Sequence, residues 1–215
     1  MAAAAAKRCS YLPEELWECI VKFLDRDDDH RTLMSLSVVS NRLLSITNRL
    51  RSSLTITNQT IPFLPRVFHR FPNITSLNLA SFSNITNDAL LCQISTLPLD
   101  IKSLNISSTA AMPISGLQAL SNKMKNLISL TCSNINYLNI DDLFVIADCF
   151  PLLEELNLSL STSLSTSYPT PTHDFVLNNH HQLVLPLPKL REINLSGDKV
   201  HCGFLIFIWQ IKSGA

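Results

Sequence analysis

Charged residues and glycine are both scarce in this chain of 215 residues, and each shortage excludes a class of function. Charged side chains make up 16% of the residues, and the 17 basic ones balance the 17 acidic ones. The chain therefore has no net charge that would attract nucleic acid, an anionic membrane surface or an acidic substrate. With only four glycines, the sequence offers almost no segment that could form a glycine-rich phosphate loop or a dinucleotide-binding turn.

The sequence also lacks a secretory signal, a membrane-length apolar run and paired cysteines. Lys7 and Arg8 follow the short alanine stretch at the start, which is the reverse of a signal peptide. The longest apolar run, 202–209, is far shorter than a membrane helix. The six cysteines contain no Cys-x-x-Cys pair, so zinc is disfavoured. We expect a soluble chain in the cytoplasm or nucleus with reduced cysteines.

Recognisable catalytic motifs are missing as well. The sequence has no Gly-x-Ser-x-Gly elbow, no His-Glu-x-x-His and no Gly-Lys-Ser/Thr loop. The acidic run Asp25 to Asp29 is interpreted as a solvated loop, and the pair His180-His181 as having no special role. We expect no catalytic residue, no metal and no cofactor. A hydrolase hidden among the many serines and histidines stays open as a rival from another class.

What the sequence has in abundance is leucine, with 36 residues arranged in a repeat. Residues 74–79 (ITSLNL) and 101–106 (IKSLNI) are near copies, and 127–132, 153–158 and 190–195 follow the same pattern. Their central apolar residues fall at 77, 104, 130, 156 and 193, with spacings of 27, 26, 26 and 37. Alternation of apolar and polar residues predicts a short strand at each core.

The second half of each unit predicts a helix. After each core, apolar residues recur three or four positions apart, as in Leu117, Leu120 and Met124. A weaker first unit combines a strand at 54–56 with a helix whose apolar face is Phe63, Leu64, Val67, Phe68 and Phe71. The extra residues that lengthen the last spacing lie at 161–172, where ten of twelve residues are Ser, Thr or Pro. This segment is predicted to be a surface loop.

A strand, a turn and a helix repeated about every 26 residues resemble the leucine-rich repeat horseshoe, of its long-helix, cysteine-containing kind. The resemblance implies an α/β solenoid over 51–215, with about five to six units, short parallel strands on the concave face and helices outside. The polar strand positions would line that face as either a plain soluble surface or a shallow site for a protein target. Few cations lie among them, which disfavours a phosphorylated target or an inositol-phosphate cofactor. The predicted substrate-binding residues are Ser76, Asn78, Ser103, Asn105, Ser129, Thr131, Glu155, Asn157, Glu192 and Asn194.

The first fifty residues follow a different pattern. A helix opens at 12–16 (LPEEL), and Leu16, Ile20 and Leu24 form a stripe along it. Leu33, Leu36 and Val39 mark a second helix, and residues 43–50 a third. Three short helices cannot bury all these side chains. The remaining apolar face is either covered by the first repeat or exposed as a docking surface.

Residues 12–16 (LPEEL), followed by Ile20, Leu24 and the segment 36–43 (LSVVSNRL), resemble an F-box. Leu43 stands where that family commonly has Trp or Phe. An F-box at 8–50 followed by repeats resembles the plant-type F-box/LRR proteins. There the F-box binds a Skp-type adaptor of a cullin ubiquitin ligase, and the repeats select the protein target. The adaptor-binding residues would be Leu12, Pro13, Leu16, Ile20, Leu24, Leu33, Leu36, Val39 and Leu43. The alternative is a repeat scaffold that binds proteins outside any ligase.

The end of the chain predicts an interrupted repeat array. Twenty residues follow Leu195, fewer than one repeat, and they include the apolar run Phe204 to Trp209. A terminal repeat needs a polar outer face, and β-prone apolar windows aggregate when exposed. We expect a shortened version of a longer repeat protein, with marginal solubility by itself.

Overall fold

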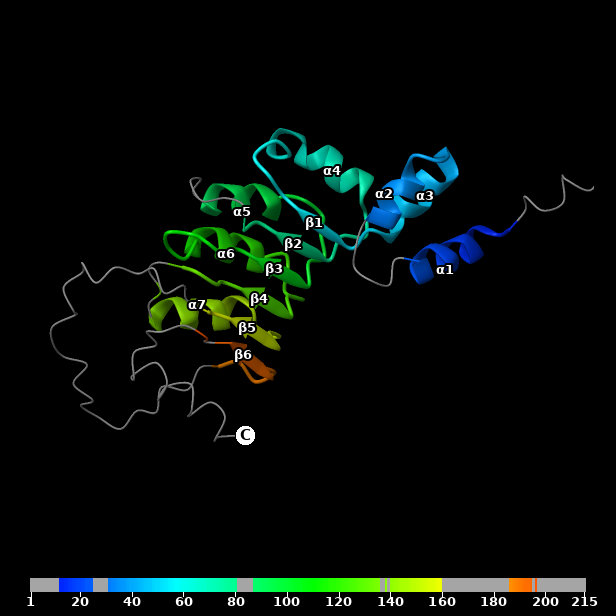
Figure 1. Cartoon of the computed structure of the whole chain (residues 1–215). Helices are drawn as coiled ribbons and strands as arrows, with labels where there is room; N and C mark the ends of the chain where they lie inside the picture. The colour runs from blue at the N-terminus through cyan, green and yellow to red at the C-terminus, as the bar shows by residue number, and fades with distance from the viewer. Residues whose placement is uncertain are drawn as a thin grey trace, which may run out of the picture.

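The computed structural model describes residues 12–24, 31–80, 87–135, 138, 140–159, 186–194 and 196 (Figure 1). The N-terminal helices are α1 (Glu14–Leu24), α2 (Arg31–Ser37) and α3 (Asn41–Leu50). Helices then alternate with strands. The later helices are η1 (Ile61–Phe63, a 3-10 turn), α4 (Leu64–Arg70), α5 (Asn87–Ser95), α6 (Ile114–Ser121) and α7 (Ile140–Cys149). The strands are β1 (Ser53–Thr55), β2 (Ser76–Asn78), β3 (Ser103–Asn105), β4 (Ser129–Thr131), β5 (Glu155–Asn157) and β6 (Glu192–Asn194).

The six strands form one parallel sheet in which every strand pairs with the next one along the chain. The central residue of each strand pairs with the next in register, through Leu54, Leu77, Leu104, Leu130, Leu156 and Ile193. Parallel neighbours need a crossover connection, and Figure 1 shows α4 to α7 following one another along the same side of the sheet. The predicted succession of strands and helices is therefore present as a parallel sheet with helices.

The main core lies between this sheet and helices α4 to α7. The central side chain of each strand from β1 to β5 is buried, while most of its neighbours are partly exposed. Leu64, Leu91, Leu117 and Ile146 meet these strand residues in one apolar cluster. The helical spacing in the sequence thus locates the face that each helix buries.

Helices α5 and α6 pack closely because α6 carries a glycine at their contact. A Cβ added to Gly116 would lie 2.6 Å from the Leu91 Cβ, closer than carbon atoms approach each other. The Gly116 N–H also donates to the Asp88 Oδ1 at 2.7 Å. Asp88 in the first turn of α5 thereby satisfies one of the open N–H groups at the start of α6.

A second apolar cluster lies within the three N-terminal helices. Val21, Leu33 and Ile46 are its buried members, one from each helix, and Trp17, Leu36, Leu43 and Leu50 pack against them. Its members are distinct from those of the main core. The N-terminal helices therefore have an interior of their own, as the change of sequence pattern predicts.

The second N-terminal helix ends earlier than the sequence predicts. Helix α2 stops at Ser37, and Val39 lies in the following turn, where its N–H donates to the Leu36 carbonyl at 3.1 Å. Ser40 then begins α3 with an extended backbone, and its Oγ accepts the Leu43 N–H at 3.2 Å. The N-cap serine favours a new helix over continuation of α2. The prediction that Val39 shares a helical stripe with Leu33 and Leu36 is wrong.

Several predictions fall outside the residues that the structure describes. These are the acidic run 25–29, the loop 161–172, the pair His180-His181 and the apolar run 204–209. Within the described ranges, no helix is both long enough and apolar enough to cross a membrane.

Candidate functional site

An apolar stripe faces outward along α1. Leu16, Ile20 and Leu24 leave 48%, 40% and 52% of their surface exposed, and they lie at successive four-residue intervals on one face of the helix. Leu12 and Pro13, just before the helix, are exposed too. Burial of these side chains against the first repeat, one of the two alternatives for the stripe, is wrong. The stripe is available to a partner.

More exposed apolar side chains follow on α2 and in the turn after it. Met34, Val38 and Val39 each leave more than half of their surface open to solvent. A small module that leaves this much apolar area uncovered is typical of a protein-docking surface. The Val39 side chain thus remains accessible, although a turn rather than a helix presents it.

Leu33 does not belong to the accessible surface. It is 3% exposed, because α2 turns it toward Val21 and Ile46. Leu36 and Leu43 are half-buried against the same cluster. The prediction that Leu33 touches the adaptor is therefore corrected: its packing supports the helices that carry the accessible residues. The sequence periodicity marks apolar positions but does not separate the inner face from the outer one.

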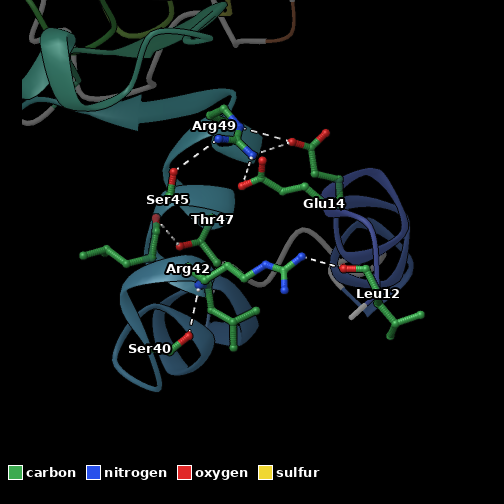
Figure 2. A network of polar contacts seen from close by, with 10 residues as sticks. Leu12, Glu14, Ser40, Arg42, Ser45, Thr47 and Arg49 are labelled. Atoms are coloured by element: carbon green, nitrogen blue, oxygen red, sulfur yellow. Dashed lines mark hydrogen bonds and ion pairs between the residues drawn. The ribbon is translucent and has the colours of Figure 1, made fainter. Parts of the chain in front are cut away.

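Polar contacts attach α1 to α3 (Figure 2). The Arg49 guanidinium lies 3.1 Å from a Glu14 carboxylate oxygen and 2.9 Å from one of Glu18. These hydrogen bonds, to Glu14 and then to Glu18, raise the pKa of Arg49. Arg42 donates from Nη2 to the Leu12 carbonyl oxygen at 2.6 Å. Two arginines of α3 thus hold the start of α1, which positions the apolar stripe.

Three short helices around one small core, with an exposed apolar stripe on the first, agree with the family comparison. Residues 9–54 match the F-box domain. This is an F-box. F-box domains bind a Skp-type adaptor in SCF-type ubiquitin ligases, and proteins that carry them are generally non-catalytic subunits. No curated protein gives a significant match to the chain.

The second candidate surface is formed by the polar positions of the strands that follow the F-box. Their Asn side chains turn back on their own backbone. The Asn Oδ1 accepts the N–H two residues further on at 3.0 Å in four strands, and the pairs are Asn78 with Ala80, Asn105 with Ser107, Asn157 with Ser159, and Asn194 with Ser196. This contact forms an Asx turn at the end of each of these four strands. The Asn residues thus have a structural role that sequence periodicity alone does not reveal.

Strand β4 has Thr131 where β2, β3, β5 and β6 have Asn, and a serine of the neighbouring unit supplies an acceptor in place of the missing amide oxygen. The Ser133 N–H, two residues after Thr131, donates to the Ser107 Oγ at 3.2 Å. The Ser133 hydroxyl also donates to the same Ser107 Oγ, at 2.7 Å. Ser107 is buried, so an unsatisfied N–H here would be costly. Nothing in the sequence pattern alone indicates this role for Ser107.

Beyond the Asn positions, this surface carries hydroxyl and carboxylate groups. Ser76, Ser103 and Ser129 are partly exposed, and Glu155 and Glu192 are exposed at the β5–β6 end. Throughout the described ranges, no three His, Cys, Asp or Glu side chains gather as metal ligands would. Burial raises the pKa of the Cys132 thiol and of the Cys149 thiol, both of which are buried. Both therefore favour the unreactive thiol form.

Proposed function

We propose that this chain is the substrate-recognition subunit of an SCF-type ubiquitin ligase. The observation that carries the proposal is the F-box match at residues 9–54, together with the exposed stripe of Leu16, Ile20 and Leu24 on α1. A receptor of this type performs no chemistry itself. It contributes proximity, because it holds a target close to an enzyme that other subunits supply. The proposal implies a location in the cytoplasm or nucleus.

The adaptor contact is proposed to centre on Leu12, Pro13, Leu16, Ile20, Leu24 and Val39. Complete burial of a large apolar side chain contributes about 1.5–3 kcal/mol. The three stripe residues are roughly half-exposed before binding, so each has about half of that contribution left to gain. Leu36 and Leu43 are proposed to add smaller contacts from their half-buried positions.

The remainder of the chain, 51–215, is proposed to be a leucine-rich repeat solenoid that selects the target. The supporting observations are the recurring sequence cores, the consecutive order of the six parallel strands and the in-register central residues. Ser76, Ser103, Ser129, Glu155 and Glu192 are the proposed target contacts. The Asn side chains are proposed to contribute their amide nitrogens, since their oxygens are held by Asx turns.

Adaptor binding by the full-length chain tests the proposal. The double variant Leu16→Glu, Ile20→Glu would bring two charges into the contact, and we expect it to lose co-purification with a Skp-type adaptor. Phe63→Glu is the matched control, since Phe63 is an equally exposed apolar residue of η1, outside the F-box match.

The two possible failures have different meanings. Undiminished adaptor binding by the double variant would show that the stripe is not the interface. Absence of adaptor binding by the wild-type chain would overturn the ligase proposal and leave a repeat scaffold that binds proteins outside any ligase.

A further inference from the structure

A pocket of about 190 Å³ lies where the F-box helices meet the first strand–helix unit. One side consists of Leu33, Met34 and Ser37 of α2 with Thr47 and Asn48 of α3. The other side consists of Arg51, which follows α3, and of Arg70 and Phe71 at the end of α4. We call it the junction pocket. It lies apart from the stripe on α1, because none of the stripe residues lines it.

Two guanidinium groups of the junction pocket stack on one aromatic ring. The Arg51 Cζ lies 5.1 Å and the Arg70 Cζ 5.2 Å from the centroid of the Phe71 ring. A cation over an aromatic face is held by the quadrupole of the ring, and its edge stays free to donate hydrogen bonds. The ring therefore holds both positive charges at the same pocket and restricts their orientation.

Neither arginine has a carboxylate partner among the residues that the structure describes. Arg49, only two residues before Arg51, pairs with both Glu14 and Glu18. Two like charges without a counter-ion repel each other. A negatively charged ligand between them would relieve that repulsion.

The remaining polar groups of the pocket supply further donors. The Arg70 Nε donates to the Asn48 Oδ1 at 3.3 Å, which directs the Asn48 amide group and leaves its Nδ2 to donate elsewhere. Within the described part of the chain, the Arg70 Nη atoms and the Arg51 guanidinium nitrogens have no hydrogen-bond acceptor, while the Arg51 backbone N–H donates to the Thr47 carbonyl. Arginine matches the geometry of phosphate oxygens and donates two parallel hydrogen bonds to them.

We propose that the junction pocket binds a compact organic phosphate monoester. The phosphate is bound by Arg51 and Arg70 with the Asn48 amide nitrogen as a further donor, and Met34 and Phe71 receive the organic part. The ligand touches both the F-box helices and the first strand–helix unit, so its binding holds the two together. This site does not depend on adaptor docking or on the polar strand surface.

Calorimetric titration of the full-length chain tests this proposal, with phenyl phosphate as the probe, inorganic phosphate as the smaller reference and phenol as the uncharged control. We expect a Kd of about 1 mM or tighter for phenyl phosphate, weaker binding of inorganic phosphate and no binding of phenol. Arg51→Gln and Arg70→Gln should each weaken phenyl phosphate about tenfold or more, since each removes charge-assisted hydrogen bonds.

Arg66→Gln is the matched control, because Arg66 is an exposed arginine of α4 that does not line the pocket. Its affinity for phenyl phosphate should equal that of the wild type. Failure of the wild-type chain to bind phenyl phosphate would overturn the proposal, whatever the variants do. Equal losses in Arg66→Gln and Arg70→Gln would overturn it too, because they would indicate a general charge effect. Circular dichroism of each variant verifies that it is folded.

Discussion

Single polar side chains satisfy backbone groups that the short strands of this protein leave open. Each strand contributes only three residues to the sheet, so the chain turns away almost at once and its N–H groups need new acceptors. The Asn residues at the strand ends provide them through Asx turns, and Ser107 provides one in place of Thr131. The alternation in the sequence correctly indicates which residues are buried. It does not reveal the Ser107 contact, because that contact depends on a neighbouring unit 26 residues away.

Ser107→Ala should destabilise the fold by about 1–3 kcal/mol, because it leaves the partly buried Ser133 N–H without an acceptor. Urea denaturation followed by circular dichroism measures the change. Adding Thr131→Asn should restore most of the loss, since an Asn at 131 can form the Asx turn found in β2, β3, β5 and β6. A double variant no more stable than Ser107→Ala would contradict this account of the β4 exception.

At the scale of helices and strands, the sequence predicts which elements form, while packing decides where they end and which side faces outward. The strand centres at 77, 104, 130, 156 and 193 all form the predicted strands. The boundary between α2 and α3 was misplaced because the cap at Ser40 competes with an apolar pattern that continues to Val39. Leu33 and Leu16 are both leucines at helical spacing, and only three-dimensional packing makes one buried and the other exposed.

Gly116→Ala tests the close packing of α5 and α6. In an exposed helix this change would stabilise the protein by about 0.5–1 kcal/mol. Here the new methyl group would meet the Leu91 Cβ at 2.6 Å, so we expect a destabilisation of about 1–3 kcal/mol. Chemical denaturation measures it, with Ser115→Ala at the exposed neighbouring position of α6 as the control. A Gly116→Ala variant as stable as wild type would show that the two helices can separate slightly at no cost.

Arg49→Gln tests whether α3 positions α1. The exposed ion pairs to Glu14 and Glu18 contribute about 0.2–1 kcal/mol each, so the loss in unfolding free energy should be small, near 1 kcal/mol. The affinity for the adaptor should fall several-fold, because the stripe is carried by a less firmly held helix. Surface plasmon resonance at two salt concentrations measures it, and high salt should reduce the difference between the wild type and the variant. A constant ratio of affinities would contradict the electrostatic explanation.

The described part of the molecule has two separate apolar cores. The cluster of Val21, Leu33 and Ile46 shares no member with the core under the sheet. At the junction, the Asn73 amide donates to the Arg49 carbonyl at 2.8 Å and Arg70 contacts Asn48. The sequence predicts the two-part arrangement through its change of period. It does not predict the junction contacts, because they join polar residues, which are not part of the apolar spacing of either part of the chain.

Removal of residues 1–50 should therefore leave a folded remainder that no longer binds the adaptor. Every buried member of the main core lies at or after Leu54, so its apolar contacts survive the truncation. We expect a smaller helical signal per residue in the far-ultraviolet circular dichroism, because α1 to α3 are removed, with a cooperative thermal transition retained at a lower temperature because the junction contacts are lost. A remainder without such a transition would indicate that the main core depends on the N-terminal helices.

The consecutive strand order also has a mechanical consequence. The hydrogen bonds between neighbouring strands run along the direction that leads from β1 to β6. A force that pulls these two edge strands apart acts on all the strand pairs in series, so the sheet is only as strong as its weakest pair. A force along a single strand instead loads all the bonds of that strand together and is resisted far more strongly. We therefore expect the sheet to yield at a lower force when it is pulled from edge to edge than when it is pulled along a strand.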